Sequence, residues 1–360
     1  MKLNYKWKMS DGFPAKGVTP HKGTVFSCFA CGGGSTLGYK LAGFEVLGCN
    51  EIDPKMNKVY VENHKPKYNY LEPIQTFKLR KDLPEELYNL DILDGSPPCS
   101  SFSMAGNREK DWGKEKKFKE GQAEQVLDTL FFDFIDLAKE LKPKVVVAEN
   151  VKGITQGEAK KYMKAIFDAF DEAGYYLDYW LMDGSEMGIP QKRERVFFIA
   201  MRKDLADNSG LPSFDLFNPM PPLELDFNFK KITFDKVRDS QNFENEFSDY
   251  YKSLWRQRLS SDKDFSCING RVNNKPNTGF GCTFAKSDKV CGTLTAKKDC
   301  YADFEEGRYL STSERVLISS FPQDYNFTAV APYYLIGMSV PPLMTARIAN
   351  EIKKQWLDKL

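Results

Sequence analysis

Short apolar runs alternate with amphipathic segments between residues 23 and about 202, and this alternation constrains the fold more than any other feature. The runs that predict strands lie at 24–29, 44–49, 91–93, 145–148, 176–181 and 196–201. The segments that predict helices lie at 35–41, 54–63, 126–141 and 159–173. Because strands that alternate with helices form parallel sheets with helices on both faces, we expect a doubly wound, mostly parallel α/β sheet.

The pattern changes after this region. Residues 203–300 carry scattered proline, asparagine, glycine and aromatic residues with weak periodicity, which predicts a second, smaller and irregular domain. Helical patterns return at 311–320 and 342–360. We therefore expect a large domain over 1–202, the small domain over 203–300, and a return segment over 301–360 that completes the large domain.

Composition limits the function classes. A chain of 360 residues that is 41% hydrophobic can bury a sizeable core, and its net charge of +1 means that any nucleic-acid surface must be local. No stretch of 18 apolar residues and no signal-peptide pattern is present, so we expect no membrane partner and a cytoplasmic location. The eight cysteines should then be mostly reduced.

The cysteines do not predict a metal site. Cys28 and Cys31 form a C-x-x-C pair, but a structural zinc site needs a second pair of ligands. Cys282, Cys291 and Cys300 are too widely spaced to supply it, and the chain has only two histidines. We therefore expect no metal.

A glycine-rich turn follows the first strand and reads FACGGGSTLG over residues 29–38. Glycines allow a sharp turn and the close approach of a ligand, and Glu51 after the second strand suits a pair of ribose hydroxyls. The motif fits nicotinamide, flavin and adenosylmethionine cofactors alike, although its spacing matches G-x-G-x-x-G poorly. A tight turn beside a surface acid is the alternative without a ligand.

A cysteine loop follows the third predicted strand and reads GSPPCSSFS over residues 95–103. The two prolines fix the backbone before Cys99, so its sulfur is aimed in one direction. A loop at the carboxyl end of a parallel strand lies where α/β proteins bind ligands, which makes Cys99 a candidate nucleophile. A buried structural cysteine is the alternative.

An acid and two arginines complete the set of candidate residues. Glu149 and Asn150 follow a buried strand, where a carboxylate is costly unless it has a polar role. Arg193 and Arg195 are two positions apart before another strand, so both can point to one side of an extended segment. Each could otherwise be a surface charge in a salt bridge.

Together these motifs resemble the cytosine-C5 DNA methyltransferase family, in that family's order. The resemblance covers roughly residues 23–202 and 291–355. Further pieces that resemble the family are Leu130-Phe131-Phe132, TLTA at 293–296, RYLS at 308–311 with Glu314, Phe321-Pro322 and IGMSVPP at 336–342. The combination is specific, although each piece alone is not.

The resemblance implies roles for the candidate residues. Cys99 would attack C6 of a flipped-out cytosine and so make C5 nucleophilic. Glu149 would hydrogen-bond N3 and the exocyclic amine, while Arg195, supported by Arg193, would stabilise charge at O2. Asn150 would hold the loop that carries the nucleophile.

The resemblance also implies S-adenosyl-L-methionine as cofactor and double-stranded DNA as substrate. A monomer acting in restriction-modification beside a cognate restriction endonuclease is expected, with residues 203–300 as target-recognition domain and the charged segment 110–121 closing over the base. The implied cofactor contacts are Phe29, Ala30, Gly32, Gly33, Gly34, Glu51, Ile52, Glu72, Pro98, Leu130, Ser339 and Val340.

Four residues depart from the family pattern, among them Glu72, where the family prefers aspartate. Cys31 and Met338 replace the usual glycine and asparagine near the cofactor, and Ser100 replaces the common glutamine after the nucleophile. An RNA cytosine methyltransferase acting on transfer RNA remains an alternative that substrate preference would separate. A catalytically inactive DNA-binding relative would have lost Cys99 or Glu149, and a dinucleotide oxidoreductase explains only the glycine turn.

Overall fold

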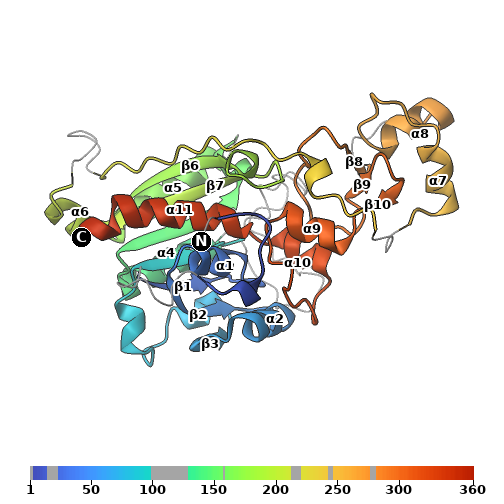
Figure 1. The fold of residues 1–360 in the computed structure, drawn as a ribbon. Helices are drawn as coiled ribbons and strands as arrows, with labels where there is room; N and C mark the ends of the chain where they lie inside the picture. Colours follow the sequence, from blue (N-terminus) through green and yellow to red (C-terminus); the bar gives the residue numbers. More distant parts are fainter. Residues whose placement is uncertain are drawn as a thin grey trace.

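The computed structural model describes residues 3–13, 23–98, 129–156, 159–211, 220–241, 246–275 and 281–360. Its main sheet has seven strands in the order β3-β2-β1-β4-β5-β7-β6 (Figure 1). The strands are β1 (Thr24–Cys28), β2 (Glu45–Glu51), β3 (Tyr68–Leu71), β4 (Ile92–Gly95), β5 (Val145–Val151), β6 (Tyr175–Asp183) and β7 (Glu194–Arg202). The strands β3, β2, β1, β4 and β5 are mutually parallel, whereas β7 runs antiparallel to both of its neighbours, β5 and β6.

The sheet is buried on both faces, which explains its apolar runs. Successive side chains of a strand point to opposite faces, so Val145 and Val147 of β5 enter one core cluster and Val146 and Ala148 the other. Strands covered on both faces need continuous apolar sequence, and β5 supplies it. The predicted doubly wound, mostly parallel α/β sheet is confirmed.

Helices cover the two faces of this sheet. The first core cluster is the one that contains Val145 and Val147, and the second contains Val146 and Ala148. The helices whose buried residues enter the first cluster are α1 (Gly34–Leu41), α2 (Pro54–His64), α6 (Lys203–Asn208), α9 (Thr312–Ile318), α10 (Pro332–Met338) and α11 (Pro342–Gln355). Those of the second cluster are α3 (Ile74–Phe77), α4 (Leu130–Leu141) and α5 (Ala159–Glu172). Short 3₁₀ turns are η1 (Met9–Asp11), η2 (Glu85–Tyr88), η4 (Lys152–Thr155), η5 (Gly184–Glu186), η6 (Phe234–Lys236) and η7 (Leu357–Lys359).

The sequence analysis missed β3 and the helices α3, α6 and α10 among the described elements of the large body. Strand β3 is four residues long at the sheet edge, and its side chains alternate between half-buried and exposed, so it carries no apolar run. Helix α10 begins with a proline at its first turn and spans only seven residues. The helix predicted from 126 begins at Leu130, after the N-cap residue Thr129, and residues 126–128 lie outside the described residues. The last helix ends at Gln355 instead of 360.

A smaller unit projects from the large body (Figure 1). It contains α7 (Asp249–Trp255), α8 (Phe265–Asn273) and a three-stranded sheet of β8 (Thr283–Ala285), β9 (Tyr301–Asp303) and β10 (Arg308–Tyr309). Its own core consists of Phe247, Leu254, Phe265, Ile268, Phe284 and Ala302. Residues 220–237 instead pack on the large body, since Met220, Leu223, Leu225, Phe234 and Val237 belong to its first core cluster.

A buried ion pair joins the two parts. The Arg308 guanidinium in β10 donates from both terminal nitrogens to Glu314 of α9, at 2.9 and 2.8 Å. Arg308 is 2% exposed and Glu314 is fully buried. The same carboxylate accepts the Ser311 N–H, in a capping box that begins α9. Two parallel N–H···O bonds fix direction as well as distance, so this pair orients the small unit on α9.

We expect Glu314→Ala to lower the free energy of unfolding by about 3 kcal/mol, because it removes two buried charge-assisted hydrogen bonds and leaves the Arg308 charge with Glu306 as its remaining partner at 2.8 Å. Urea unfolding at pH 7 measures the change. The control is Asp168→Ala, which breaks an exposed pair with Lys164 and should have no measurable effect. Equal stability of the two variants would contradict the assigned role of the junction.

No helix in the described parts of the chain is both long and apolar enough to cross a membrane.

Candidate active site

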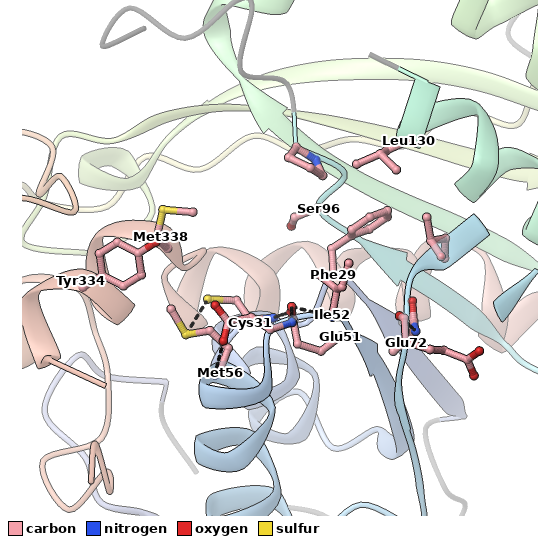
Figure 2. A pocket seen from close by; sticks show the side chains of 14 residues that line it. Phe29, Cys31, Glu51, Ile52, Met56, Glu72, Ser96, Leu130, Tyr334 and Met338 are labelled. Atoms are coloured by element: carbon pink, nitrogen blue, oxygen red, sulfur yellow. Dashed lines mark hydrogen bonds between the residues drawn. The ribbon is translucent and has the colours of Figure 1, made fainter. Parts of the chain in front are cut away.

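A pocket opens at the carboxyl ends of β1, β2, β3 and β4, where the connections that leave β1 and β4 run toward opposite edges of the sheet (Figure 2). Ligands of open α/β sheets bind at such a switch point. Its lining residues are Phe29, Cys31, Asn50, Glu51, Ile52, Asp53, Met56, Glu72, Ile74, Ser96, Pro98, Leu130, Tyr334 and Met338.

Six of the predicted cofactor contacts line this pocket, and six do not. The six that line it are Phe29, Glu51, Ile52, Glu72, Pro98 and Leu130. The remaining six, which do not line it, are Ala30, Gly32, Gly33, Gly34, Ser339 and Val340. The pocket is therefore lined by strand ends, α2, α4 and α10, while Gly34 packs against Ser339 and Val340 of the last motif, IGMSVPP at 336–342.

The glycines are required by packing within the protein. Gly33 has φ +85°, and a Cβ there would lie 2.1 Å from the His64 ring nitrogen Nε2. A Cβ on Gly34 would lie 2.3 Å from the Val340 carbonyl oxygen. The sequence analysis assigned these glycines to a sharp turn and to ligand approach. The positive φ of Gly33 agrees with the turn, and the structure adds a further reason, since α2 and the segment before α11 pack directly against it.

Glu51 is the most strongly oriented polar group of the pocket. One carboxylate oxygen accepts the Cys31 N–H at 2.6 Å, and the other accepts the N–H groups of Ile52 and Asp53 at 2.8 and 2.9 Å. Burial raises the pKa of Glu51, and the three backbone donors partly oppose this shift. The carboxylate is thus held in one place, with acceptor capacity left for a ligand hydroxyl pair.

Glu72 lies at the far wall, after β3. Its carboxylate accepts from Arg80 Nε at 2.7 Å, so the acid already has an ionic partner. The Asn50 amide donates to the carbonyls of Tyr70 and Glu72, which fixes the backbone at this wall. Asn50 was missed from the sequence because a buried asparagine near the end of an apolar strand carries no motif.

Sulfur-containing and aromatic side chains form the wall opposite Glu72 (Figure 2). The Cys31 sulfur lies 3.7 Å from the Met56 sulfur, and Tyr334 and Met338 of α10 complete this wall. Burial, with a smaller contribution from Glu51, raises the pKa of Cys31 to about 12, so the thiol stays protonated near neutral pH. Two of the departures from the family pattern, Cys31 and Met338, thus lie on one wall of the pocket.

Glu149 and Arg195 form an ion pair between β5 and β7. Arg195 Nε lies 2.9 Å from a Glu149 carboxylate oxygen, and both side chains are largely buried. The antiparallel register pairs Arg195 with Val151, so these two side chains meet diagonally across the ladder. Burial lowers the pKa of Arg195, and the Glu149 charge opposes that shift.

Asn150 holds the loop that leads to the predicted nucleophile. Its amide donates to the Pro97 carbonyl at 3.1 Å, and its side-chain oxygen accepts the Val151 N–H at 2.8 Å. The sequence placed this contact at the Pro98 to Cys99 loop, and the structure places it one residue earlier. Cys99 and the charged segment 110–121 lie outside the described residues.

Arg193 lies near the ion pair, but its guanidinium binds backbone. It is buried and donates to the carbonyls of Leu294, Gly337 and Ser339 at 2.9, 3.1 and 3.0 Å. Burial, reinforced by the Arg195 charge, lowers the pKa of Arg193 well below its usual value. Any support that Arg193 gives to Arg195 is therefore indirect. Its guanidinium connects the start of β7 to Leu294, between β8 and β9, and to the last motif, IGMSVPP at 336–342.

Asp94 is a buried acid below the site that the sequence analysis did not single out. Its carboxylate accepts from Ser27 Oγ at 2.7 Å and from the Tyr39 hydroxyl at 3.2 Å. The pKa of Asp94 is raised to about 7, mainly by burial and to a smaller extent by the Glu149 charge. The two hydroxyl donors oppose this shift. The residue ties β4, which leads to the Pro97 turn, to β1 and α1.

We expect the free energy of unfolding to fall as pH rises from about 4 to 7 through the contribution of Asp94. The folded-state pKa of about 7 lies above the unfolded value of about 3.9, so in this window the folded protein binds a proton that the unfolded chain releases. The slope should reach about 1.4 kcal/mol per pH unit. Urea titrations of wild type and Asp94→Asn measure it, and parallel pH profiles would contradict the assignment.

Within the described residues, no group of three or more His, Cys, Asp and Glu side chains could hold a metal ion.

Comparison with known proteins gives a consistent result. The sequence model of a family described as C-5 cytosine-specific DNA methylase matches residues 23–354. Type II methyltransferase M.FnuDI of Fusobacterium nucleatum is 29% identical, covering 93% of this chain and 95% of that protein. Type II methyltransferase M.Bsp6I of Bacillus sp. (strain RFL6) is 28% identical, covering 92% and 99%.

Solved structures share the fold. A putative DNA modification methyltransferase encoded within an E. coli prophage is 20% identical and superimposes with a TM-score of 0.62, covering 92% of this chain and 99% of that one. A DNMT2 mutant of Spodoptera frugiperda is 18% identical with a TM-score of 0.62, covering 91% and 99%.

Proposed function

The chain belongs to the C-5 cytosine-specific DNA methylase family, and on that premise we propose that Cys99 is the nucleophile that activates a flipped-out cytosine for methylation by S-adenosyl-L-methionine. DNA (cytosine-5) methyltransferase activity is the activity of that family. The observation that carries the residue assignment is the buried Glu149–Arg195 pair, which lies beside the Pro97 turn leading to Cys99.

The chemistry needs a covalent step because C5 of cytosine is a poor nucleophile. The Cys99 thiolate attacks C6 and forms an S–C6 bond, and the electron pair of the C5–C6 double bond moves toward C5 and the ring. C5 then takes the methyl group, loses its proton to a base, and the C6–S bond breaks to return the thiolate. The target carbon is inaccessible in a duplex, so the base must leave the stack.

Glu149 and Arg195 fit the charge that develops on the ring. A protonated Glu149 can donate to cytosine N3 and its second oxygen can accept from the exocyclic amine, while the Arg195 guanidinium faces the same region and can donate to O2. Arg195 Nη1 also donates to the Glu194 carbonyl at 2.7 Å, which fixes the orientation of the guanidinium before substrate enters. A preorganised donor of this kind needs no rearrangement during the reaction.

The pocket residues fit adenosylmethionine. Glu51 at the end of β2 offers a fixed carboxylate to a ribose hydroxyl pair. Phe29, Ile52 and Leu130 supply apolar surface for a base. The bound cofactor would supply an electrophilic methyl group, and Pro98 on the pocket wall places the nucleophile loop next to it.

The small unit is the proposed reader of the DNA sequence. Base edges in the major groove carry the sequence information, and lysine and arginine contacts to phosphates position the protein. The relatives M.FnuDI and M.Bsp6I are named as type II methyltransferases, which supports a restriction-modification role. A cognate endonuclease as partner and a monomeric state belong to the same proposal. The sequence analysis gave this domain the limits 203–300, whereas the small unit described above spans 246–309, because α6 and residues 220–237 pack on the large body and β9 and β10 belong to the small sheet.

Cys99→Ser should abolish methyl transfer to unmethylated duplex DNA while leaving the dissociation constant for S-adenosyl-L-methionine within about twofold of wild type, because the serine hydroxyl is a far weaker nucleophile. Incorporation of a labelled methyl group and calorimetry measure the two quantities. Cys267→Ser in α8 is the matched control and should retain full activity. Turnover by Cys99→Ser at the wild-type rate would remove Cys99 from the mechanism.

Glu149→Gln should slow the single-turnover rate by about 10²–10⁴-fold, because the amide cannot supply the proton at N3. Glu194→Gln is the control: Glu194 pairs with Lys152 at 2.8 Å on the same strand as Arg195 but away from the proposed base. A rate for Glu149→Gln within threefold of wild type, with DNA binding intact, would contradict its role as proton donor.

A further inference from the structure

The N-terminal segment 3–13 lies before the region matched by the family, yet it is packed into the large body. Trp7 is 4% exposed, and its indole Nε1 donates to the Ser320 carbonyl at 2.9 Å. The Trp7 carbonyl in turn accepts the Gln323 N–H at 3.0 Å. Phe13 packs edge-on against the Trp7 ring at 6.0 Å between ring centres. These contacts attach the segment to the loop between α9 and α10.

The carboxylate of Asp324, in the loop between α9 and α10, binds the same segment. Asp324 accepts the Met9 N–H with one oxygen at 2.7 Å and the Ser10 N–H with the other at 2.9 Å. Burial alone would raise the pKa of Asp324, but these backbone donors bring it below its ordinary value. The acid therefore stays ionised near neutral pH and holds the beginning of η1.

The loop held in this way supports the glycine turn of the pocket. Tyr325, one residue after Asp324, is buried and donates its hydroxyl to the Gly32 carbonyl. Its ring packs against Phe321 and His64, at 5.3 and 6.1 Å between centres. The contacts therefore form a chain from Trp7 and Asp324 through Tyr325 to the turn that carries Cys31.

The turn has a conformation that needs such support. Phe29 and Cys31, which both line the pocket, have φ values of +51° and +48°, in the left-handed region that side chains with a Cβ disfavour. The Cys31 N–H also orients Glu51. A turn that left this conformation would lose the binding-competent pocket, and apparent affinity falls in proportion to the competent fraction.

We propose that residues 3–13 act as a clamp that sets cofactor affinity, with Trp7 and Asp324 as positioning residues that hold the glycine turn through Tyr325. The inference rests on the proposed function, since it takes S-adenosyl-L-methionine as the ligand of this pocket. Neither positioning residue lines the pocket itself.

Full-length Trp7→Ala and Asp324→Ala test the clamp by calorimetric titration with S-adenosyl-L-methionine and, separately, S-adenosyl-L-homocysteine. We expect dissociation constants about tenfold higher for Trp7→Ala and about threefold higher for Asp324→Ala. KM for the cofactor should rise by the same factors, while kcat at saturating cofactor should stay within twofold, because the catalytic pair is untouched.

Trp356→Ala is the matched control for lost stability. Trp356 follows α11 and is fully buried, and its indole Nε1 donates to the Pro222 carbonyl at 3.2 Å, a contact that does not reach the glycine turn. This variant should lower the melting temperature without weakening cofactor binding. Weakening as large as that in Trp7→Ala would show that general destabilisation is the cause and would overturn the clamp.

The remaining outcomes separate the clamp from the proposed function. Should Trp7→Ala fail to fold, Asp324→Ala decides, because Asp324 lies at the surface and its truncation leaves the core intact. Wild-type affinity in the variants that fold would overturn the clamp alone. A wild-type protein that binds neither ligand would overturn the proposed function and the clamp with it.

Discussion

The site depends on one buried ion pair, Glu149 with Arg195, held 2.9 Å apart at the ends of two strands. Neither charge would be stable there without the other, because burying an unpaired charge costs several kcal/mol. The pair exists because β7 runs antiparallel in an otherwise parallel part of the sheet, so the beginning of β7 lies beside the carboxyl end of β5. Because β7 is reversed, its Arg195 lies at the same edge of the sheet as Glu51, Glu149 and the Pro97 turn, which follow or end the parallel strands.

Segments distant in sequence complete this edge from behind. Arg193 binds carbonyls at Leu294, Gly337 and Ser339, so it joins the start of β7 to the small-unit segment and the last motif. The glycine turn packs on α2 and on the start of α11, and the N-terminal segment reaches it through the α9–α10 loop. The wall that would hold the cofactor therefore depends on segments from both ends of the chain, and the Arg308–Glu314 pair attaches the small unit to α9.

The sequence predicted the features that follow from local pattern. Apolar runs located the buried strands, and the position of Glu51 and Glu149 at strand ends predicted their place at one edge of the sheet. Features that depend on tertiary contacts were not predictable: β3 is a half-exposed edge strand, Asp94 is a lone acid in an apolar run, and the reason for Gly33 is the distant ring of His64. The direction of Arg193 was equally hidden, because a period of two fixes the side of a strand and not the partner.

The most direct test of the central claim is methyl transfer by the purified wild-type chain, with S-adenosyl-L-methionine, to unmethylated genomic DNA and to unmodified transfer RNA in parallel, followed by base-resolution detection of 5-methylcytosine. The account predicts 5-methylcytosine at one recurring short sequence in the duplex DNA and none in the RNA. Methylation of the transfer RNA alone, or no 5-methylcytosine in either substrate, would contradict it.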